Sequence, residues 1–230
     1  TGLASILVEE NGKNRIIVYP GANNYITPAD IEEPFTCYPD AVYMQLEIPF
    51  DAVVEATRRA NEADIPVFID AGPASVDYDL SRLGKVEIFS PNESETRVFT
   101  GITPNSEENC LRAAIKLSTL VNARYILLKL GDRGAFLYDG RQYYTFPAEK
   151  TEVVDTTAAG DVFTAALTYW YLEKGNILKA ADFAGCAAAV SVSRAGASTS
   201  VPTLSEVIAF AKTRAQEQAA AENAEAAKSE

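Results

Sequence analysis

Short apolar segments alternate along this chain with segments whose apolar residues recur at helical spacing. The expected strands are 41–46, 66–70, 86–90 and 125–130, and the helices expected between them are 50–63, 95–100 and 106–121. Apolar runs of this length suit strands that are buried on both faces. Strands that alternate with helices predict an α/β fold with a mostly parallel sheet and helices on both faces of the sheet.

The segments at either end of this alternating region have patterns of their own. Two β-rich runs, 1–8 and 15–19, flank an Asn11-Gly12 pair and predict a hairpin. Further along, 135–139 and 143–146 predict a second hairpin, followed by helices at 160–173 and 177–194 and a last helix capped by Ser205. Residues 214–230 are rich in Ala, Glu and Gln, and we expect an exposed helical or disordered tail there.

The composition excludes several classes of function. The formal net charge of −12 argues against a nucleic-acid partner. The chain has no histidine, and its three cysteines form no CxxC pair, so zinc sites and histidine-based triads are excluded or nearly so. No run of 18 apolar residues is present, so we expect no membrane partner. Cysteines of this number and spacing favour a reducing, cytoplasmic setting.

The segment 153–166 (VVDTTAAGDVFTAA) predicts a polar loop that opens into a helix with almost no side-chain bulk at the opening. The first N–H groups of a helix have no partner within the helix, and the helix dipole adds partial positive charge, so such an opening suits a phosphate. Asp161 would face this anion site. An acidic residue in a first helical turn is also stabilising for its own sake, and the spacing alone leaves both interpretations open.

Polar or glycine residues follow five of the expected strands: Glu47, Asp70, Asn92, Gly131 and Asp155. Ligands of parallel α/β sheets bind beyond the carboxyl ends of the strands. We therefore expect these residues to lie along one rim of the sheet, although more than a hundred residues separate the first from the last.

Five motifs together resemble the ribokinase-like sugar kinases of the PfkB family. They are YPGAN (19–23), PNESE (91–95), LLKLGDRG (127–134), DTTAAGDVF (155–163) and SRAGASTSVP (193–202), and their order and spacing agree with the family over residues 1–213. The resemblance implies a three-layer α/β/α ribokinase-like fold with a small β lid. It also implies about a hundred further residues before Thr1, so that 1–213 would be a truncated kinase domain, 1–24 the lid-side hairpin and 214–230 the tail.

The resemblance implies an ATP-dependent kinase that phosphorylates ribose at the 5-hydroxyl. Asp161 would be the catalytic base, and the backbone N–H groups of Ala158, Ala159, Gly160 and Asp161 would form the anion hole. Such amides are suited to phosphoryl transfer, which depends on positioning and on stabilising the oxygens of the transferred group. Two alternatives stay open: another kinase of the same family, acting on fructose, another pentose or a nucleoside, and a nucleotide-binding domain without catalysis.

The resemblance also assigns binding residues for both substrates. Glu47 and Asp161 would contact the sugar. The ATP-binding residues would be Asn92, Lys129, Leu130, Gly131, Asp132, Arg133, Gly134, Gly160, Asp161 and Gly185. Gly185 departs from the family, in which ribokinases often have a histidine beside the adenine. The two glycines Gly131 and Gly134 are equally explained as punctuation of a hairpin.

Two cation sites follow from the same resemblance. Asn92 and Glu95 match the NxxE motif, which would organise Mg²⁺, although the same pair at this spacing also forms a helix capping box. Potassium would be bound by Asp155, Thr157, Ser191, Arg194, Gly196 and Ser200, mostly through backbone carbonyl groups. The alternative interpretation is that 196–200 is a flexible loop. We expect the longer parent protein to form a homodimer.

Overall fold

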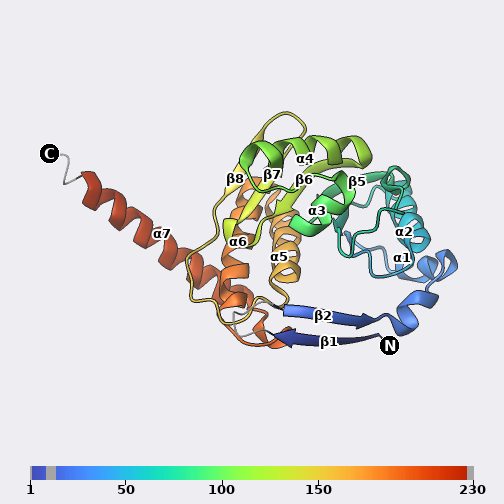
Figure 1. The fold of residues 1–230 in the computed structure, drawn as a ribbon, viewed down its shortest axis with the longest axis horizontal. Helices are drawn as coiled ribbons and strands as arrows, with labels where there is room; N and C mark the ends of the chain where they lie inside the picture. Colours follow the sequence, from blue (N-terminus) through green and yellow to red (C-terminus); the bar gives the residue numbers. More distant parts are fainter. Residues whose placement is uncertain (1, 9–13, 227–230) are drawn as a thin grey trace. The chain divides into compact units, whose positions relative to one another are not determined.

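The computed structural model describes residues 2–8 and 14–226 and divides them into two compact units. The first unit contains the described residues of 1–8 and 15–148, and the second contains Asn14 and the described residues of 149–230. The predicted Asn11-Gly12 turn lies outside the described residues. Figure 1 shows the helices and strands along the chain.

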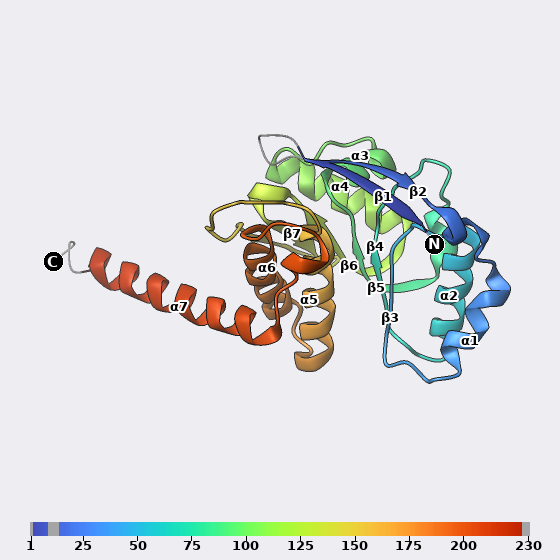
Figure 2. The ribbon, with the colours of Figure 1, turned by 90° about the horizontal axis from the view of Figure 1, so that it is seen from below.

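A six-stranded sheet forms the framework of the first unit. Its strands are β3 (Val42–Met44), β4 (Val67–Asp70), β5 (Lys85–Ser90), β6 (Asn122–Lys129), β7 (Ala135–Tyr138) and β8 (Tyr143–Phe146), in that spatial order. The first four strands are mutually parallel, and the last two add an antiparallel hairpin, as predicted. Figure 2 shows β3 to β7 of this sheet from below. All the parallel strands end at the same edge, which is where the predicted site residues of this unit lie. The prediction that Asp155 also follows a strand was wrong, because residues 147–158 form no strand.

One face of this sheet packs on helices through a continuous apolar core. The long helices of the unit are α2 (Phe50–Glu62), α3 (Glu93–Thr100) and α4 (Glu107–Leu120), and a short helix α1 (Glu32–Phe35) precedes them. Side chains such as Val53 from α2 and Leu117 from α4 join Ile69 and Phe89 of the sheet in this core. The opposite side-chain set of the same strands, including Phe68, is equally buried. The near-continuous apolar runs of the sequence follow from burial on both faces.

A separate two-stranded sheet consists of β1 (Leu3–Val8) and β2 (Asn14–Tyr19), which run in opposite directions (Figure 1). Its large apolar side chains are exposed, and they include Leu3, Leu7, Ile17 and Tyr19. The predicted pairing of these two segments is therefore present, without a packed core of its own.

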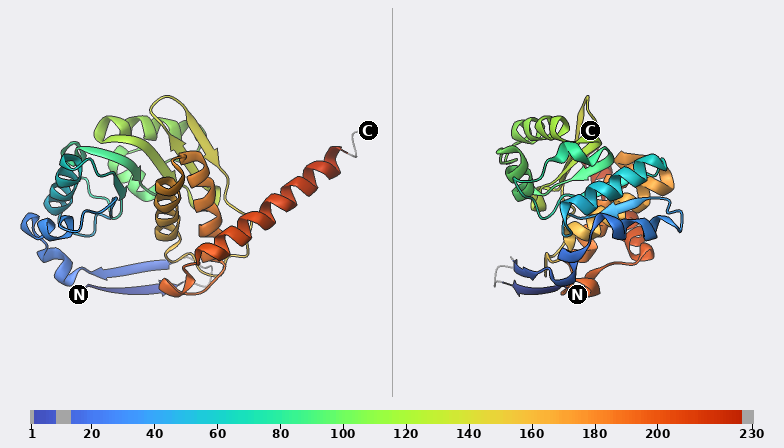
Figure 3. Two further views of the ribbon diagram at one scale, coloured as in Figure 1. Left: turned by 180° about the vertical axis from the view of Figure 1, so that it is seen from behind. Right: turned by 90° about the vertical axis from the view of Figure 1, so that its right-hand side faces the viewer.

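The second unit consists of α5 (Ala159–Lys174), α6 (Ile177–Val192) and α7 (Leu204–Ala226), with one turn of 3₁₀ helix at Ser198–Ser200. Helices α5 and α6 lie side by side (Figure 3). The rings of Trp170 and Phe183 stack between them with centroids 4.1 Å apart, and Val207 of α7 joins the same core. The many alanines of α6 allow this close approach, because small side chains let helices pack tightly.

Several predicted boundaries were wrong, among them the starts of three elements. Helix α3 begins at Glu93 rather than at residue 95, because Asn92 is its N-cap. Strand β6 begins at Asn122 rather than at residue 125, since the parallel pairing with β5 extends to its first residues. The last helix begins at Leu204, so Ser205 lies inside it, and the hydroxyl of Thr203 accepts the Glu206 N–H at 3.4 Å.

Helix α7 continues through the predicted tail as far as the described residues go, to Ala226. Arg214, the first residue of that predicted tail, is nevertheless anchored, because its guanidinium contacts Glu149 and Asp182. Among the described residues, no helix is both long enough and apolar enough to cross a membrane.

Candidate active site

A buried ion pair lies at the carboxyl edge of the first unit's sheet. Asp70 ends β4 and Lys129 ends β6, and the Nζ atom of Lys129 lies 2.6 Å from each carboxylate oxygen of Asp70. The side chains are 6% and 13% exposed, respectively. Strand β5 separates the two strands, and its last residue is Ser90, whose small side chain is fully buried. Lys129 is one of the predicted ATP-binding residues, and in this structure its ammonium group is paired with Asp70.

The predicted magnesium residues form a complete capping box at the start of α3. The Asn92 side chain accepts the Glu95 N–H at 2.9 Å, and the Glu95 carboxylate accepts the Asn92 N–H at 2.7 Å. The amide of Asn92 also donates to the same carboxylate at 2.7 Å. Asn92 and Glu95 therefore form the capping box that their spacing predicts. Any role of the pair in organising Mg²⁺ would be additional to this capping role.

Glu95 is held close to the end of β4. A Cβ atom placed on Gly72 would lie 2.6 Å from Glu95 Oε1, so a side chain at that position would displace the carboxylate. Burial raises the pKa of Glu95 above its ordinary value, and its hydrogen bonds with Asn92 and the charge of Lys129 act in the opposite direction. A bound cation would favour the ionised form of such a carboxyl group.

The predicted nucleotide segment 129–134 forms a tight turn between β6 and β7. The Leu130 N–H donates to the Gly134 carbonyl at 2.8 Å, and Gly131 and Gly134 both have positive φ. A Cβ atom on Gly134 would lie 1.9 Å from the Phe146 carbonyl oxygen, so only glycine fits there. Asp132 and Arg133 are exposed, and the Arg133 guanidinium contacts Glu93. The turn therefore presents backbone at the sheet edge.

Glu47, the predicted sugar contact of the first unit, follows β3 and is exposed. Because β3 and β4 are parallel, Glu47 comes after the same edge of the sheet as Asp70. Its carboxylate can accept hydrogen bonds from two hydroxyl groups at once.

The second unit contains the predicted anion hole at the N-terminus of α5. The N-cap residue Ala158 has left-handed backbone, with φ of 63°, and makes no side-chain capping bond. Gly160 and Asp161 lie in the first turn, and the Asp161 side chain is exposed. The helix therefore opens on small residues, with a carboxylate beside its N–H groups.

Asp155 ties this loop to the end of α6. Its Oδ1 accepts the Thr157 N–H and its Oδ2 accepts the Gly196 N–H, each at 2.9 Å, while its own N–H donates to the Val192 carbonyl at 3.2 Å. The hydroxyl and N–H of Thr157, together with the Gly196 N–H, hold the pKa of Asp155 below its ordinary value. A carboxylate so bound is ionised at neutral pH and has little freedom to move.

The remaining predicted potassium residues lie around the same loop. The hydroxyl oxygens of Ser191 and Ser200 are both buried and 3.1 Å apart. Arg194 directs its side chain to Glu206 of α7, and this contact, with hydrogen bonds from Thr203, lowers the pKa of Glu206 to about 2. Any contribution of Arg194 to a cation would therefore come from its backbone.

Gly185 of α6 faces a different set of charged groups. An added Cβ atom there would contact only the Glu149 side chain, at 4.0 Å. Glu149 accepts a hydrogen bond from Arg214 at 2.6 Å, and Asp182 accepts another at 2.7 Å.

Reasoning from the sequence missed these contacts, as it missed Asp70 and Glu206 as partners of predicted site residues. The one available signal was Lys129, a charged residue in an otherwise apolar strand.

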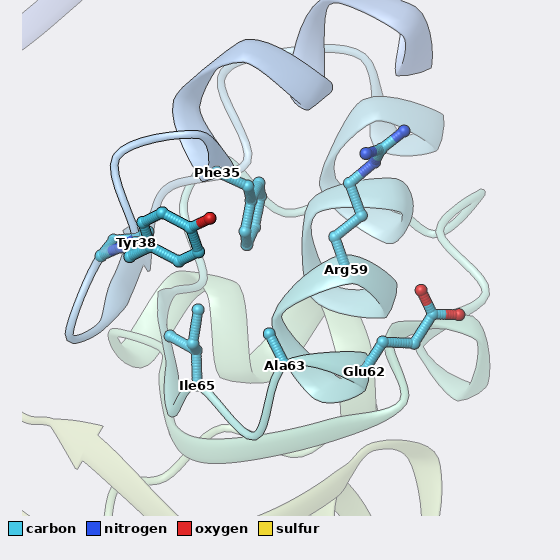
Figure 4. Close-up of a pocket in the computed structure, with 7 residues that line it drawn as sticks. Phe35, Tyr38, Arg59, Glu62, Ala63 and Ile65 are labelled. Carbon is cyan, nitrogen blue, oxygen red and sulfur yellow. The ribbon is translucent and has the colours of Figure 1, made fainter.

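One pocket of the first unit lies away from these residues. Its volume is about 510 Å³, and Figure 4 shows its lining. The lining residues are Phe35, Tyr38, Pro39, Arg59, Glu62, Ala63 and Ile65. Ile65 precedes β4, so this pocket lies at the amino end of the strand and contains none of the predicted site residues. Among the described residues, no group of three or more His, Cys, Asp and Glu side chains could hold a metal.

Comparison with known families identifies the class of this protein. Residues 1–204 match the model of the pfkB family of carbohydrate kinases. The chain belongs to this family.

Three relatives show which members of the family the chain is similar to. It is 35% identical over 212 residues to a bifunctional ribokinase/ribose-5-phosphate isomerase A from Fructilactobacillus sanfranciscensis, with 90% of the chain and 39% of that protein covered. It is 35% identical to a ribokinase structure from Thermotoga maritima, with a TM-score of 0.79 and coverage of 92% and 70%. It is 30% identical to the Arabidopsis thaliana ribokinase structure with ribose and ATP, with a TM-score of 0.80 and coverage of 91% and 69%.

These structural likenesses confirm the predicted fold class, a three-layer α/β/α ribokinase-like fold. The chain spans less than half of the bifunctional relative and about 70% of the two ribokinases. What these relatives bind and catalyse is therefore the basis of a proposal for this chain.

Proposed function

We propose that this chain carries the nucleotide-binding and catalytic part of an ATP-dependent ribose kinase. The reaction converts D-ribose and ATP into D-ribose 5-phosphate and ADP. The observation that carries the proposal is the N-terminus of α5, where Ala158 leaves the helix uncapped by any side chain and Asp161 follows in the first turn. The similarity to ribokinases, one of them solved with ribose and ATP, supports ribose as the substrate.

In the proposed mechanism, Asp161 accepts the proton of the ribose 5-hydroxyl while the oxygen of that hydroxyl attacks the γ-phosphorus of ATP. The bond from the γ-phosphorus to the bridging oxygen breaks, and ADP leaves. The N–H groups of residues 158–161 stabilise the oxygens of the phosphoryl group as it moves. The exposed carboxylate of Asp161 is suited to this task, because a base must reach a substrate that enters from solvent.

Two cations are part of the proposal. Asn92 and Glu95 offer the hard oxygen donors that Mg²⁺ prefers, and both Glu95 oxygens already accept hydrogen bonds, which fits an indirect contact through water. Mg²⁺ would supply positive charge to the phosphates of ATP. The oxygen-rich loop around Asp155, Ser191 and Ser200 fits a potassium ion, which would stabilise the neighbouring anion hole electrostatically.

The nucleotide would contact the 129–134 turn and Gly185 in addition to Asn92 and the α5 N-terminus. The sugar would contact Glu47 as well as Asp161. We further propose that residues 1–213 form the kinase region, with 214–230 as its C-terminal extension. A homodimer of the longer protein and a cytoplasmic location stay predictions, the latter supported by three cysteines that are free among the described residues.

The decisive experiment measures ADP release with ribose, 2-deoxyribose, fructose and adenosine, for wild type and for Asp161→Asn. We expect ribose to be preferred and the substitution to lower kcat roughly 10²- to 10⁴-fold, the usual contribution of a general base. ATP affinity, measured by calorimetry, should change little. Asp161→Asn with near-normal turnover would refute the assignment of the base.

Asp64→Asn serves as the matched control. Asp64 is exposed and has a left-handed backbone that asparagine also tolerates, and it lies between α2 and β4, away from the predicted site residues. This substitution should leave kcat unchanged. ATP binding without phosphoryl transfer to any sugar, in a chain that is folded by circular dichroism, would favour the nucleotide-binding domain without catalysis.

A further inference from the structure

The loop between α6 and α7 is fixed at both of its ends by one side chain of α7. Arg194 follows the end of α6, and Thr203 precedes α7. Glu206 contacts both residues. Its Oε1 lies 2.5 Å from Arg194 Nη2, and its Oε2 accepts the Thr203 N–H at 2.7 Å and the Thr203 hydroxyl at 2.8 Å. The carboxylate therefore closes residues 194–203 into a ring.

This ring contains three of the six predicted potassium residues, Arg194, Gly196 and Ser200. Within it, the Gly196 N–H donates to Asp155, and the Ser200 hydroxyl lies beside that of Ser191. The Ser200 hydroxyl also donates to the Ala197 carbonyl at 2.7 Å. The loop is otherwise built from small residues, with positive φ at Gly196. Besides the bond from Ser200, the Thr199 hydroxyl donates to the Ala195 carbonyl at 3.1 Å, and the closure by Glu206 adds to these two contacts at the ends of the loop.

We propose that Glu206 is a positioning residue for the monovalent cation, because it pre-orders the carbonyl groups of the 195–203 loop. This inference rests on the proposed function. When a cation binds to a disordered loop, the free energy of ordering that loop is subtracted from the binding free energy. A loop that is already closed therefore binds the cation more tightly. Outer-shell groups that orient metal ligands typically change affinity or activity ten- to a hundredfold when they are removed.

A simpler role for Glu206 makes a different prediction. Thr203 and Glu206 also have the spacing of a helix capping box at the start of α7. If capping were the whole role, its loss would lower stability without changing the affinity for potassium. The cation dependence therefore separates the two roles.

The test compares wild type with Glu206→Gln and Glu206→Ala. Glutamine keeps an acceptor for Thr203 and removes the charge that holds Arg194, so it should have an intermediate effect. Two readouts are used: the KCl concentration for half-maximal ADP release, and the rise in Tm with KCl against choline chloride at equal ionic strength. We expect the potassium midpoint to rise roughly ten- to a hundredfold in Glu206→Ala, with kcat at saturating KCl largely restored.

Asn176→Ala is the matched control. The Asn176 side chain caps α6 by accepting the Lys179 N–H at 3.0 Å, at the end of the helix opposite the loop. This variant should lose stability and keep the wild-type potassium midpoint. If Glu206→Ala behaved in the same way, the positioning role would be overturned, and it would also be overturned if the wild-type Tm did not respond to potassium. A potassium-dependent Tm that Glu206→Ala weakens, without turnover of any sugar, would uphold the positioning role and refute only the kinase proposal.

Discussion

Removing Lys129 from its ion pair with Asp70 should destabilise the first unit more than any ordinary substitution of a surface lysine. At 2.6 Å, two unit charges attract each other with a gross energy of about 6 kcal/mol at an effective dielectric constant of 20. Desolvation of the two groups offsets much of that attraction in the native protein. Lys129→Met removes the attraction and leaves the Asp70 carboxylate buried without its cation, so we expect a loss of about 3–5 kcal/mol.

The assay is urea unfolding followed by far-ultraviolet circular dichroism. The single tryptophan, Trp170, lies in the second unit, so its fluorescence would not report directly on this sheet. With an m-value of about 3 kcal/mol/M, the loss corresponds to a fall of about 1–1.7 M in the urea midpoint. Lys85→Met is the control, because Lys85 is exposed at the start of β5, and it should shift stability by less than about 0.5 kcal/mol.

A double-mutant cycle completes the test. Asp70→Asn combined with Lys129→Met removes both charges, and it should recover a large part of the stability that the single Lys129 substitution loses. The reasoning would be refuted if Lys129→Met cost less than about 1 kcal/mol, or if the two substitutions were simply additive.

Two further predictions concern steric fit and cysteine reactivity. Gly134→Ala should lower the free energy of unfolding by more than about 3 kcal/mol, because its Cβ atom would lie 1.9 Å from a carbonyl oxygen. Gly101→Ala is the control, since Gly101 has φ of 70° and open space around it, and it should cost only the roughly 1–2 kcal/mol of a left-handed alanine. Equal costs in thermal unfolding would contradict the predicted clash. At pH 8, only the exposed Cys37 should react rapidly with a thiol reagent, because Cys110 and Cys186 are buried. Burial raises the pKa of both thiols, and it raises that of Cys186 to about 11. All three thiols should react in urea, and rapid labelling of a second thiol in the native protein would disprove this.

Local sequence signals predicted the elements and several of their ends. The Asn92–Glu95 spacing predicted a capping box, and Gly101 ends α3 with a left-handed backbone, as a helix C-terminal glycine does. The expected start of this helix at residue 95 did not follow that signal, since a helix begins at the residue after its cap. Ser205 was misjudged because Thr203 and Ser205 are both suitable N-cap residues, and local propensity does not choose between them.

The candidate site could be predicted only where a residue acts through its own backbone or lies at the end of an element. The pairs that fix it are long-range: Asp70 with Lys129 across 59 residues, and Arg214 with Glu149 across 65. Which charges meet depends on strand order and helix packing, and the spacing of residues along the chain contains neither. Sequence reasoning therefore identified Lys129 as a charged residue in an apolar strand but did not find Asp70 as its partner.

The left-handed backbone of Ala158 restricts how this loop can vary during evolution. A residue with a Cβ atom is destabilised by about 1–2 kcal/mol in that conformation, and a branched side chain is destabilised by more. Glycine would relieve the cost without remodelling the loop, so alanine and glycine can exchange there with little effect on fold. β-Branched residues would be disfavoured there even if they never touched a substrate, so their absence at this position in other members of the family would reflect backbone geometry as much as chemistry.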